Sequence, residues 1–190
     1  MSAFGTLLKA REASLFYSTP ISRRYYNDES GKMYEFVYKL ETVQPSGSFK
    51  DRGIGFMIQT LKNRKESEGK AVELLICSSG GNAGLSVATL GQSLGIPTHI
   101  VVPLTTPDSV VEKLQKKDAI VTRHGENWNA ADQLARTMLS ETVGSDYIPP
   151  FNDPLIWEGH STIVTELYDQ LKGVAPSAIV LSVGGGTNAF

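Results

Sequence analysis

The chain has 190 residues, of which 41% are hydrophobic and 20% are charged, and its formal net charge is −2 at pH 7. This length allows one domain with a hydrophobic core but is too short for two full domains. The weak negative charge and the short basic runs give no electrostatic reason to expect nucleic acid as a partner. No apolar stretch reaches the about 20 residues that span a bilayer, so we expect no membrane partner.

A hairpin is the first predicted element. Residues 33–40 alternate between aromatic and other side chains, as a strand does, and they follow the turn-forming run Asn27-Asp28-Glu29-Ser30-Gly31. The preceding Arg24-Tyr25-Tyr26 would form the partner strand.

The next segment, Pro45-Ser46-Gly47-Ser48-Phe49-Lys50-Asp51-Arg52-Gly53, places one lysine behind an aromatic residue, just before a predicted helix. A lysine amine has a pKa of about 10.4, so it forms a Schiff base at neutral pH only where burial or a neighbouring cation lowers that value. Phe49 could supply an apolar wall for Lys50. The alternative is an exposed lysine in the first turn of a helix.

A second segment, Ser78-Ser79-Gly80-Gly81-Asn82-Ala83-Gly84, follows the apolar run Val72 to Cys77 and opens a stretch with helical spacing. A strand, a turn of small residues and a helix N-terminus together form an anion site, because backbone N–H groups point toward the ligand. Glycines also let the chain approach a ligand closely. The alternative is a simple turn.

Strands and helices alternate from about residue 45 to residue 145, which predicts parallel pairing, right-handed crossovers and a three-layer α/β unit. Ligands in such sheets bind at the carboxyl ends of strands, where Ser78 follows Cys77. The predicted helices cover 53–64, 82–94, 108–116 and 128–139, and the predicted strands cover 72–77, 98–102 and 119–122.

Beyond residue 147 the sequence predicts a proline-rich connector, a helix over 157–171 and a strand over 178–183. The predicted strand is apolar on both faces, so it needs a paired neighbour and helices on either side. We therefore expect an exposed hydrophobic edge in this chain, and association or aggregation through it.

Several conspicuous residues have a structural interpretation. Asp51 and Arg52 are predicted to form a local charge pair at a helix start, and Trp128 and Trp157 to pack in the core or at a hinge. The histidines lie far apart, so no metal site is expected; they are His99, His124 and His160.

The single cysteine and the N-terminus bear on the cellular compartment. Cys77 cannot form an internal disulfide, and its apolar neighbours predict a small buried side chain rather than a nucleophile. The motif that begins at Thr19 leaves little room for a targeting peptide. We expect a cytoplasmic location, with a mitochondrial one left open.

Taken together, these segments resemble the fold type II pyridoxal-phosphate enzymes, and specifically the serine/threonine dehydratase family. The resemblance is colinear and extends to Gly186. Besides the lysine and asparagine loops, it rests on Thr19-Pro20-Ile21-Ser22, on Ile100 to Pro103 followed by Thr106-Pro107, and on the segment from Tyr147 to His160, which resembles the L-serine dehydratase branch.

The resemblance implies a role for each matching position, with pyridoxal 5′-phosphate as cofactor and a small amino acid as substrate. Lys50 would bind the cofactor aldehyde and then remove the Cα proton, while Phe49 would pack near the cofactor ring. Asn82 would donate a hydrogen bond to the phenolic oxygen of the ring. The substrate carboxylate would be held by the backbone donors of the loop residues Ser78, Ser79, Gly80 and Ala83, and the loop around the phosphate would begin with Gly184, Gly185 and Gly186.

The resemblance also implies a division into domains. Residues 1–44 would be the N-terminal part of a large domain, residues 45–146 a small α/β domain with Lys50 and the Ser78–Gly84 loop, and residues 147–190 the start of the remaining large domain. The family forms homodimers, and the sequence leaves open whether this chain does.

The C-terminus departs from the family pattern. Relatives have four glycines and then a helix, whereas this chain has Gly184-Gly185-Gly186 followed by Thr187-Asn188-Ala189-Phe190. A phosphate dianion needs several convergent N–H donors, so we expect an unfinished phosphate site, a large domain only partly present, and doubtful activity for this chain.

Three functions therefore follow from the resemblance. The first is β-elimination of L-serine to pyruvate plus ammonia, with elimination of L-threonine to 2-oxobutyrate left open. The second is an inactive shortened chain that binds a full-length relative. The third is a related reaction, because threonine synthases share the Ser-Phe-Lys-Asp-Arg-Gly run and serine racemases share the asparagine loop.

Overall fold

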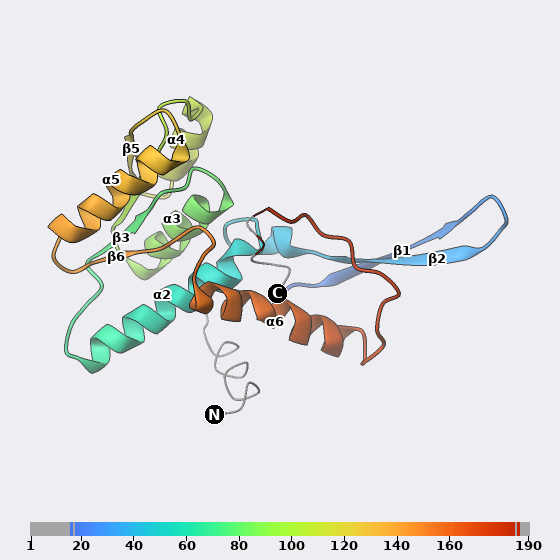
Figure 1. The fold of residues 1–190 in the computed structure, drawn as a ribbon. Coiled ribbons are helices and arrows are strands. Elements are labelled where there is room, and N and C mark those ends of the chain that lie inside the picture. Colours follow the sequence, from blue (N-terminus) through green and yellow to red (C-terminus); the bar gives the residue numbers. More distant parts are fainter. Residues whose placement is uncertain (1–15, 17, 185, 187–190) are drawn as a thin grey trace.

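A parallel four-stranded sheet with the order β5-β4-β3-β6 forms the centre of the protein, as the computed structural model of residues 16, 18–184 and 186 shows (Figure 1). The strands are β3 (Leu74–Cys77), β4 (Thr98–Val102), β5 (Ile120–Arg123) and β6 (Ser145–Tyr147). The helices are α2 (Lys50–Ser67), α3 (Asn82–Leu94), α4 (Asp108–Gln115), α5 (Trp128–Glu141) and α6 (Pro154–Gln170). Within this described part of the chain, every helix is too short or too polar to cross a membrane.

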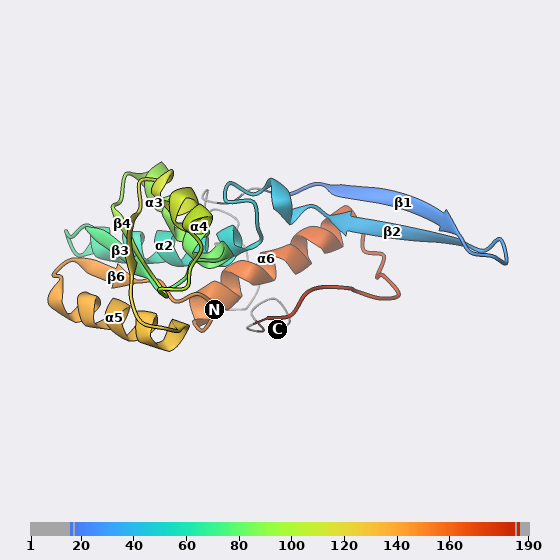
Figure 2. The ribbon, with the colours of Figure 1, turned by 90° about the horizontal axis from the view of Figure 1, so that it is seen from above.

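The sheet is buried on both faces, and successive strand residues face opposite layers. Leu75 and Ile100 pack with α2, α3 and α4, whereas Ile76 and Val101 pack with α5, and all four side chains are fully buried. Figure 2 shows α5 on one side of the sheet and α3 and α4 on the other. Apolar residues on both faces are typical of parallel sheets covered by helices. The predicted three-layer α/β fold is confirmed.

The predicted hairpin is also present. Strands β1 (Ile21–Asn27) and β2 (Met33–Lys39) pair antiparallel, with Ile21 opposite Lys39 and Asn27 opposite Met33. The Asp28 carboxylate stabilises the turn, because it accepts hydrogen bonds from the backbone N–H groups of Ser30 and Lys32. The hairpin projects away from the sheet (Figure 2), and a 3-10 helix, η1 (Glu41–Val43), connects it to the lysine segment.

Two helices begin earlier than the sequence predicts, and one strand is missing from the prediction. Helix α2 begins at Lys50 rather than residue 53, so the lysine belongs to its first turn. Helix α6 begins at Pro154 rather than residue 157, because the Asp153 carboxylate accepts a hydrogen bond from the N–H of Leu155 and caps the helix. The missed strand, β6, has only 3 residues and takes its stability from pairing with β3.

The predicted strand over 178–183 is wrong, because these residues form neither a strand nor a helix. No strand in the described part of the chain pairs with them, and a lone strand has no stability in water. Their side chains are accordingly exposed, with Val180 at 97% and Ile179 at 71% of full accessibility.

The predicted pair between Asp51 and Arg52 is wrong as well. Asp51 instead accepts hydrogen bonds from the backbone N–H of Ser46 and from the hydroxyl of Ser86. The fully buried Arg52 guanidinium forms ion pairs with Glu41 of η1 at 2.8 Å and with Glu166 of α6 at 3.0 Å. Arg52 therefore links α2 to two other elements of the fold.

Candidate active site

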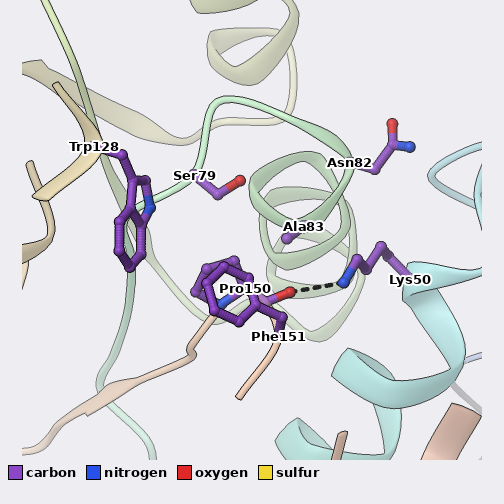
Figure 3. Close-up of a pocket in the computed structure, with 7 residues that line it drawn as sticks. All are labelled: Lys50, Ser79, Asn82, Ala83, Trp128, Pro150 and Phe151. Carbon is purple, nitrogen blue, oxygen red and sulfur yellow. Dashed lines mark hydrogen bonds between the residues drawn. The ribbon is translucent and has the colours of Figure 1, made fainter. Parts of the chain in front are cut away.

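A pocket of about 290 Å³ lies at the carboxyl end of the sheet. It is lined by seven residues, which Figure 3 shows: Lys50, Ser79, Asn82, Ala83, Trp128, Pro150 and Phe151. They come from loops that follow β3, β5 and β6 and from the start of α2. Parallel strands place the loops after their carboxyl ends on one edge, so residues from position 79 to position 151 meet there.

Three of these lining residues are the first residues of helices. Lys50 begins α2, Asn82 begins α3 and Trp128 begins α5. The first N–H groups of a helix lack partners within the helix, and the helix dipole places partial positive charge at that end. The pocket therefore favours an anionic ligand.

The Lys50 amine lies in the pocket and donates a hydrogen bond to the carbonyl oxygen of Pro150 at 2.7 Å (Figure 3). Burial lowers the pKa of Lys50 below its usual value, because the charged ammonium is separated from water. A lysine in this state has a larger fraction of neutral, nucleophilic amine at neutral pH than an exposed lysine has. The alternative of an exposed lysine in the first turn of a helix does not hold, because Lys50 is partly buried and lines the pocket.

The loop between β3 and α3 brings Ser79, Asn82 and Ala83 to the same pocket. Its tight path requires glycine at position 84, where a Cβ atom would lie 1.6 Å from the carbonyl oxygen of Ser79. Gly80 does not line the pocket: a Cβ atom there would meet Val102 at 3.3 Å. In Figure 3 the Asn82 amide extends away from the Pro150 carbonyl.

The structure does not place the Ser78 side chain in the pocket. Its hydroxyl is buried and donates a hydrogen bond to the Asp132 carboxylate at 2.6 Å, while the Tyr147 hydroxyl lies 2.9 Å away. The Trp128 indole donates a hydrogen bond to the Ser78 carbonyl oxygen at 2.7 Å. Ser78 therefore connects the loop to α5 and β6.

Phe49 lies beside the pocket without lining it. Its ring centroid is 4.9 Å from that of His160, and the Lys50 amine lies 5.3 Å from the Phe49 ring centre. The phenyl ring is thus in contact with both the candidate nucleophile and a histidine of α6.

The predicted phosphate residues are not brought to this pocket. Gly184 is exposed, a Cβ atom added to it would meet no other atom within 4 Å, and neither Gly184 nor Gly186 lines the pocket. Gly185 lies outside the described residues. Among the residues that the structure describes, the pocket is formed by the lysine and asparagine loops without the glycine run.

Sequence reasoning missed Trp128, Pro150 and Phe151 as pocket residues. The sequence predicts core or hinge packing for Trp128, but this residue lines the pocket, and its ring centroid lies 5.7 Å from that of Phe151. The positions of these residues in the chain were the available signal for a pocket. Trp128 lies at a helix start after a predicted strand, and Pro150 and Phe151 follow the missed strand β6.

Cys77 is buried at the end of β3, as predicted. Burial raises the pKa of its thiol to about 12, so the thiol stays protonated and unreactive at neutral pH. The only cysteine in the chain is therefore not the nucleophile of this site.

Comparisons with known proteins agree with this geometry. The family model described as pyridoxal-phosphate dependent enzyme matches residues 15–190. The chain is 41% identical over 167 residues to L-serine dehydratase of Dictyostelium discoideum, covering 86% of this chain and 47% of the relative. It is 47% identical over 148 residues to human L-serine dehydratase/L-threonine deaminase, covering 78% of this chain and 43% of the relative.

A solved structure shows the same fold. The fungal L-serine ammonia-lyase from Rhizomucor miehei matches with a TM-score of 0.78 and 32% identity, covering 92% of this chain and 53% of the fungal chain. The chain thus spans about half the length of the curated relatives it matches. With a match over most of its residues and the same α/β fold, the chain belongs to the family of pyridoxal-phosphate dependent enzymes, fold type II.

Proposed function

We propose that this protein acts in the pyridoxal-phosphate-dependent β-elimination of L-serine, and of L-threonine as a second substrate, releasing ammonia and pyruvate or 2-oxobutyrate. The observation that carries the proposal is the Lys50 amine, which lies in a pocket at the N-terminus of α3 with its pKa lowered by burial. The similarity to L-serine dehydratases supports the choice of substrate.

The residues present fit one end of the cofactor. Lys50 provides an amine for the aldehyde, and Asn82 provides an amide within the same pocket for the ring hydroxyl. The cavity of about 290 Å³ lies just below the range of about 300–1,000 Å³ for small-molecule sites. The phosphate end has no counterpart in the pocket, so its donors must come from outside the described pocket residues.

The roles of the chain's own residues follow from these placements. When bound, pyridoxal phosphate supplies an electron sink that makes the Cα proton of the substrate acidic. Lys50 accepts that proton, since its amine is neutral more often than that of an exposed lysine. The backbone N–H groups of Ser79, in the loop before α3, and of Ala83, in the first turn of α3, hold the substrate carboxylate. Trp128 and Phe151 exclude water from one side.

The proposal also assigns domains. Residues 45–146 are the small domain that carries the lysine and asparagine loops, while residues 1–44 and 147–190 belong to the large domain.

The first test adds pyridoxal phosphate and then borohydride to the purified chain, with mass spectrometry to locate the modified residue. We expect the label on Lys50, loss of the label in Lys50→Ala, and no loss in Lys62→Ala, which removes a more exposed lysine of the same helix. Release of pyruvate from L-serine, coupled to NADH oxidation by lactate dehydrogenase, tests the reaction itself.

The outcomes of the labelling and pyruvate measurements are read together. Label on Lys50 together with release of pyruvate from L-serine supports the proposed function. Label on Lys50 without pyruvate supports cofactor binding alone, and D-serine as the product would replace elimination by racemisation. No label on Lys50 at saturating cofactor contradicts the proposal.

A second candidate function is favoured by the exposed apolar segment 178–183. Its residues Ile179, Val180 and Val183 are each at least 60% accessible, although they are as apolar as the buried strands of the sheet. The second function is an inactive chain that binds a longer relative through this segment, because an uncovered apolar segment favours association.

This candidate is tested by co-purification with a tagged full-length dehydratase. We expect binding by the natural chain and weaker binding by Val180→Asp, which places a charge on the 97%-exposed position. The matched control is Val143→Asp, because Val143 is 93% exposed but lies between α5 and β6. Equal binding by both variants would exclude the segment as the contact.

A further inference from the structure

His160 is a buried titratable residue that the proposed reaction does not use. It lies in α6, only 4% of its surface is accessible, and its ring packs against Phe49. Its Nδ1 atom accepts a hydrogen bond from the backbone N–H of Gly53 at 3.1 Å. The contact joins residues that are 107 positions apart in the sequence.

Helices α2 and α6 approach each other closely at this histidine. A Cβ atom on Gly53 would lie 2.5 Å from the carbonyl oxygen of Ile156 and 2.6 Å from Cε1 of His160. A Cβ atom on Gly159 would lie 2.4 Å from the carbonyl oxygen of Arg52. Glycine on both helices therefore permits an approach that brings the imidazole to the backbone of α2.

The bond to Gly53 acts at the start of α2. The first four N–H groups of a helix have no partner within the helix and need an acceptor from elsewhere. Gly53 is the fourth residue of α2, and the carbonyl oxygen of Phe49, four positions before it, accepts a hydrogen bond from the N–H of Arg52 instead. His160 provides an acceptor from another helix.

The accepting role determines the protonation state of the ring. Nδ1 accepts only as an unprotonated nitrogen, so the single ring proton of the neutral imidazole is on Nε2. Burial, together with the positive charges of Lys50 and Arg52, lowers the pKa of His160 to about 3. Nε2 has no hydrogen-bond partner among the described residues. The imidazole is therefore held by Nδ1 and by its ring contact.

A continuous set of contacts runs from this imidazole to the candidate nucleophile. The Phe49 ring lies against His160 at 4.9 Å on one side and within 5.3 Å of the Lys50 amine on the other. Lys50 is also held at its tip by the Pro150 carbonyl, in the segment that leads into α6. The direction of the lysine thus depends on how the first turn of α2 is seated on α6.

We propose that His160 is a positioning residue, whose imidazole holds the first turn of α2 in place and thereby directs the Lys50 amine into the pocket. His160 does not line the pocket, and it acts through Gly53 and Phe49. This inference rests on the proposed function only for the chemical role of Lys50, which is to bind the cofactor aldehyde and accept the Cα proton.

The test measures the Lys50 amine itself, without cofactor or serine. The full 190-residue chain is treated with trace acetic anhydride over a series of pH values, and mass spectrometry follows acetylation of Lys50 relative to exposed Lys70. The variants are His160→Leu, which removes the acceptor, and His160→Asn, whose amide oxygen is bonded to Cγ as Nδ1 is and so retains the acceptor. His99→Gln is the control, because His99 bonds Thr122 in the sheet, away from α2.

We expect the apparent pKa of Lys50 to rise in His160→Leu and to stay low in His160→Asn and His99→Gln. Each unit of increase lowers the Lys50 acetylation rate at pH 7 by about tenfold. Should His160→Leu lose its secondary structure by circular dichroism, His160→Gln, whose amide oxygen lies one bond further from the backbone than Nδ1, takes its place with the same expectation.

Two results would overturn the proposal. One is a folded His160→Leu or His160→Gln with reduced stability but unchanged Lys50 labelling, which is what a purely structural histidine gives. The other is a His160→Asn variant that behaves like His160→Leu. Because neither cofactor nor serine is present, these results stand apart from the success or failure of the proposed reaction.

Discussion

The sheet unit with its pocket and the projecting hairpin with the 178–183 segment differ in how they bury their apolar residues. In the sheet unit, Ile76 and Val101 are fully buried between helices. In the hairpin, Phe36 is 50% exposed, and in the C-terminal segment Val180 is 97% exposed. All of these regions contain large apolar side chains, yet among the described residues only those of the sheet unit are covered by other parts of the chain.

The difference in burial indicates which region is stabilised by contacts within the described part of the chain. Burial of one large apolar side chain is worth about 1.5–3 kcal/mol, and the sheet unit obtains this from local βα connections. The hairpin and the segment obtain little of it within the described residues. The pocket residues from Lys50 to Phe151 all belong to the covered region, whereas the predicted glycine run at 184–186 does not.

The largest effect on stability is expected from replacing Arg52, which links α2 to η1 at the base of the hairpin and to α6. Arg52→Met leaves the carboxylates of Glu41 and Glu166 without their buried cation, which should lower the free energy of unfolding by about 3–5 kcal/mol. Urea denaturation followed by circular dichroism measures it. The control, Arg123→Met, removes a more exposed ion pair and should cost less than about 1 kcal/mol. Equal losses of unfolding free energy in Arg52→Met and Arg123→Met would contradict the stabilising role of the buried Arg52 ion pairs.

A matched pair of isoleucines sharpens the comparison. Ile76→Ala opens a cavity between β3 and α5 and should cost about 2–5 kcal/mol. Ile179→Ala removes the same atoms from a side chain that is 71% exposed and should stay within about 0.5 kcal/mol. The same urea titration serves for both. A large loss at Ile179 would mean that the segment is covered in solution.

The pH dependence of stability tests the burial of His160, which lies at the contact of α2 with α6 in the sheet unit. Burial lowers the folded-state pKa of His160 to about 3, against an unfolded value of about 6.5, so the unfolded chain binds the proton first. This contribution is complete above about pH 6.5 and is lost as the pH falls toward about 3, with a slope of up to about 1.4 kcal/mol per pH unit.

The corresponding measurement is the urea midpoint at several pH values across that window. We expect a smaller slope in His160→Gln, because glutamine does not titrate, and an unchanged slope in Ser161→Ala as a neighbouring control. A slope that His160→Gln leaves unaltered would assign the pH dependence to other groups.

The smallest expected effect is at the cap of α5. The Asn127 side chain accepts a hydrogen bond from the N–H of Ala130, so Asn127→Ala should cost about 1 kcal/mol. The matched control Asn129→Ala, two positions later on the exposed surface, should change stability by less than about 0.5 kcal/mol. Tryptophan fluorescence reports the loosening as well, because Trp128 follows the cap directly.

Most of the α/β unit could be predicted because its signals are local. Apolar runs between helical stretches predict parallel strands, and the helix over 82–94 and the strand over 98–102 have the bounds that periodicity predicts. Strand β6 was missed because 3 residues give too short a pattern, and its stability comes from β3. The strand predicted at 178–183 is absent because its pattern requires a neighbour.

The candidate site was predictable in part. Lys50, Ser79, Asn82 and Ala83 were predicted from motifs, and the structure brings them together. The structure also shows that the Ser78 hydroxyl bonds Asp132, which lies 54 positions further along the chain. Such a partner leaves no local pattern in the sequence.

The sequence by itself determined the alternation of strands and helices, the lysine and asparagine loops, and the family. Only the tertiary structure decided that Trp128, Pro150 and Phe151 share a pocket with Lys50, and that Arg52 and His160 seat α2 on α6. The physical reason is range: hydrophobic periodicity and turn chemistry act between near neighbours, whereas burial and long-range hydrogen bonds depend on which distant segments come to lie together.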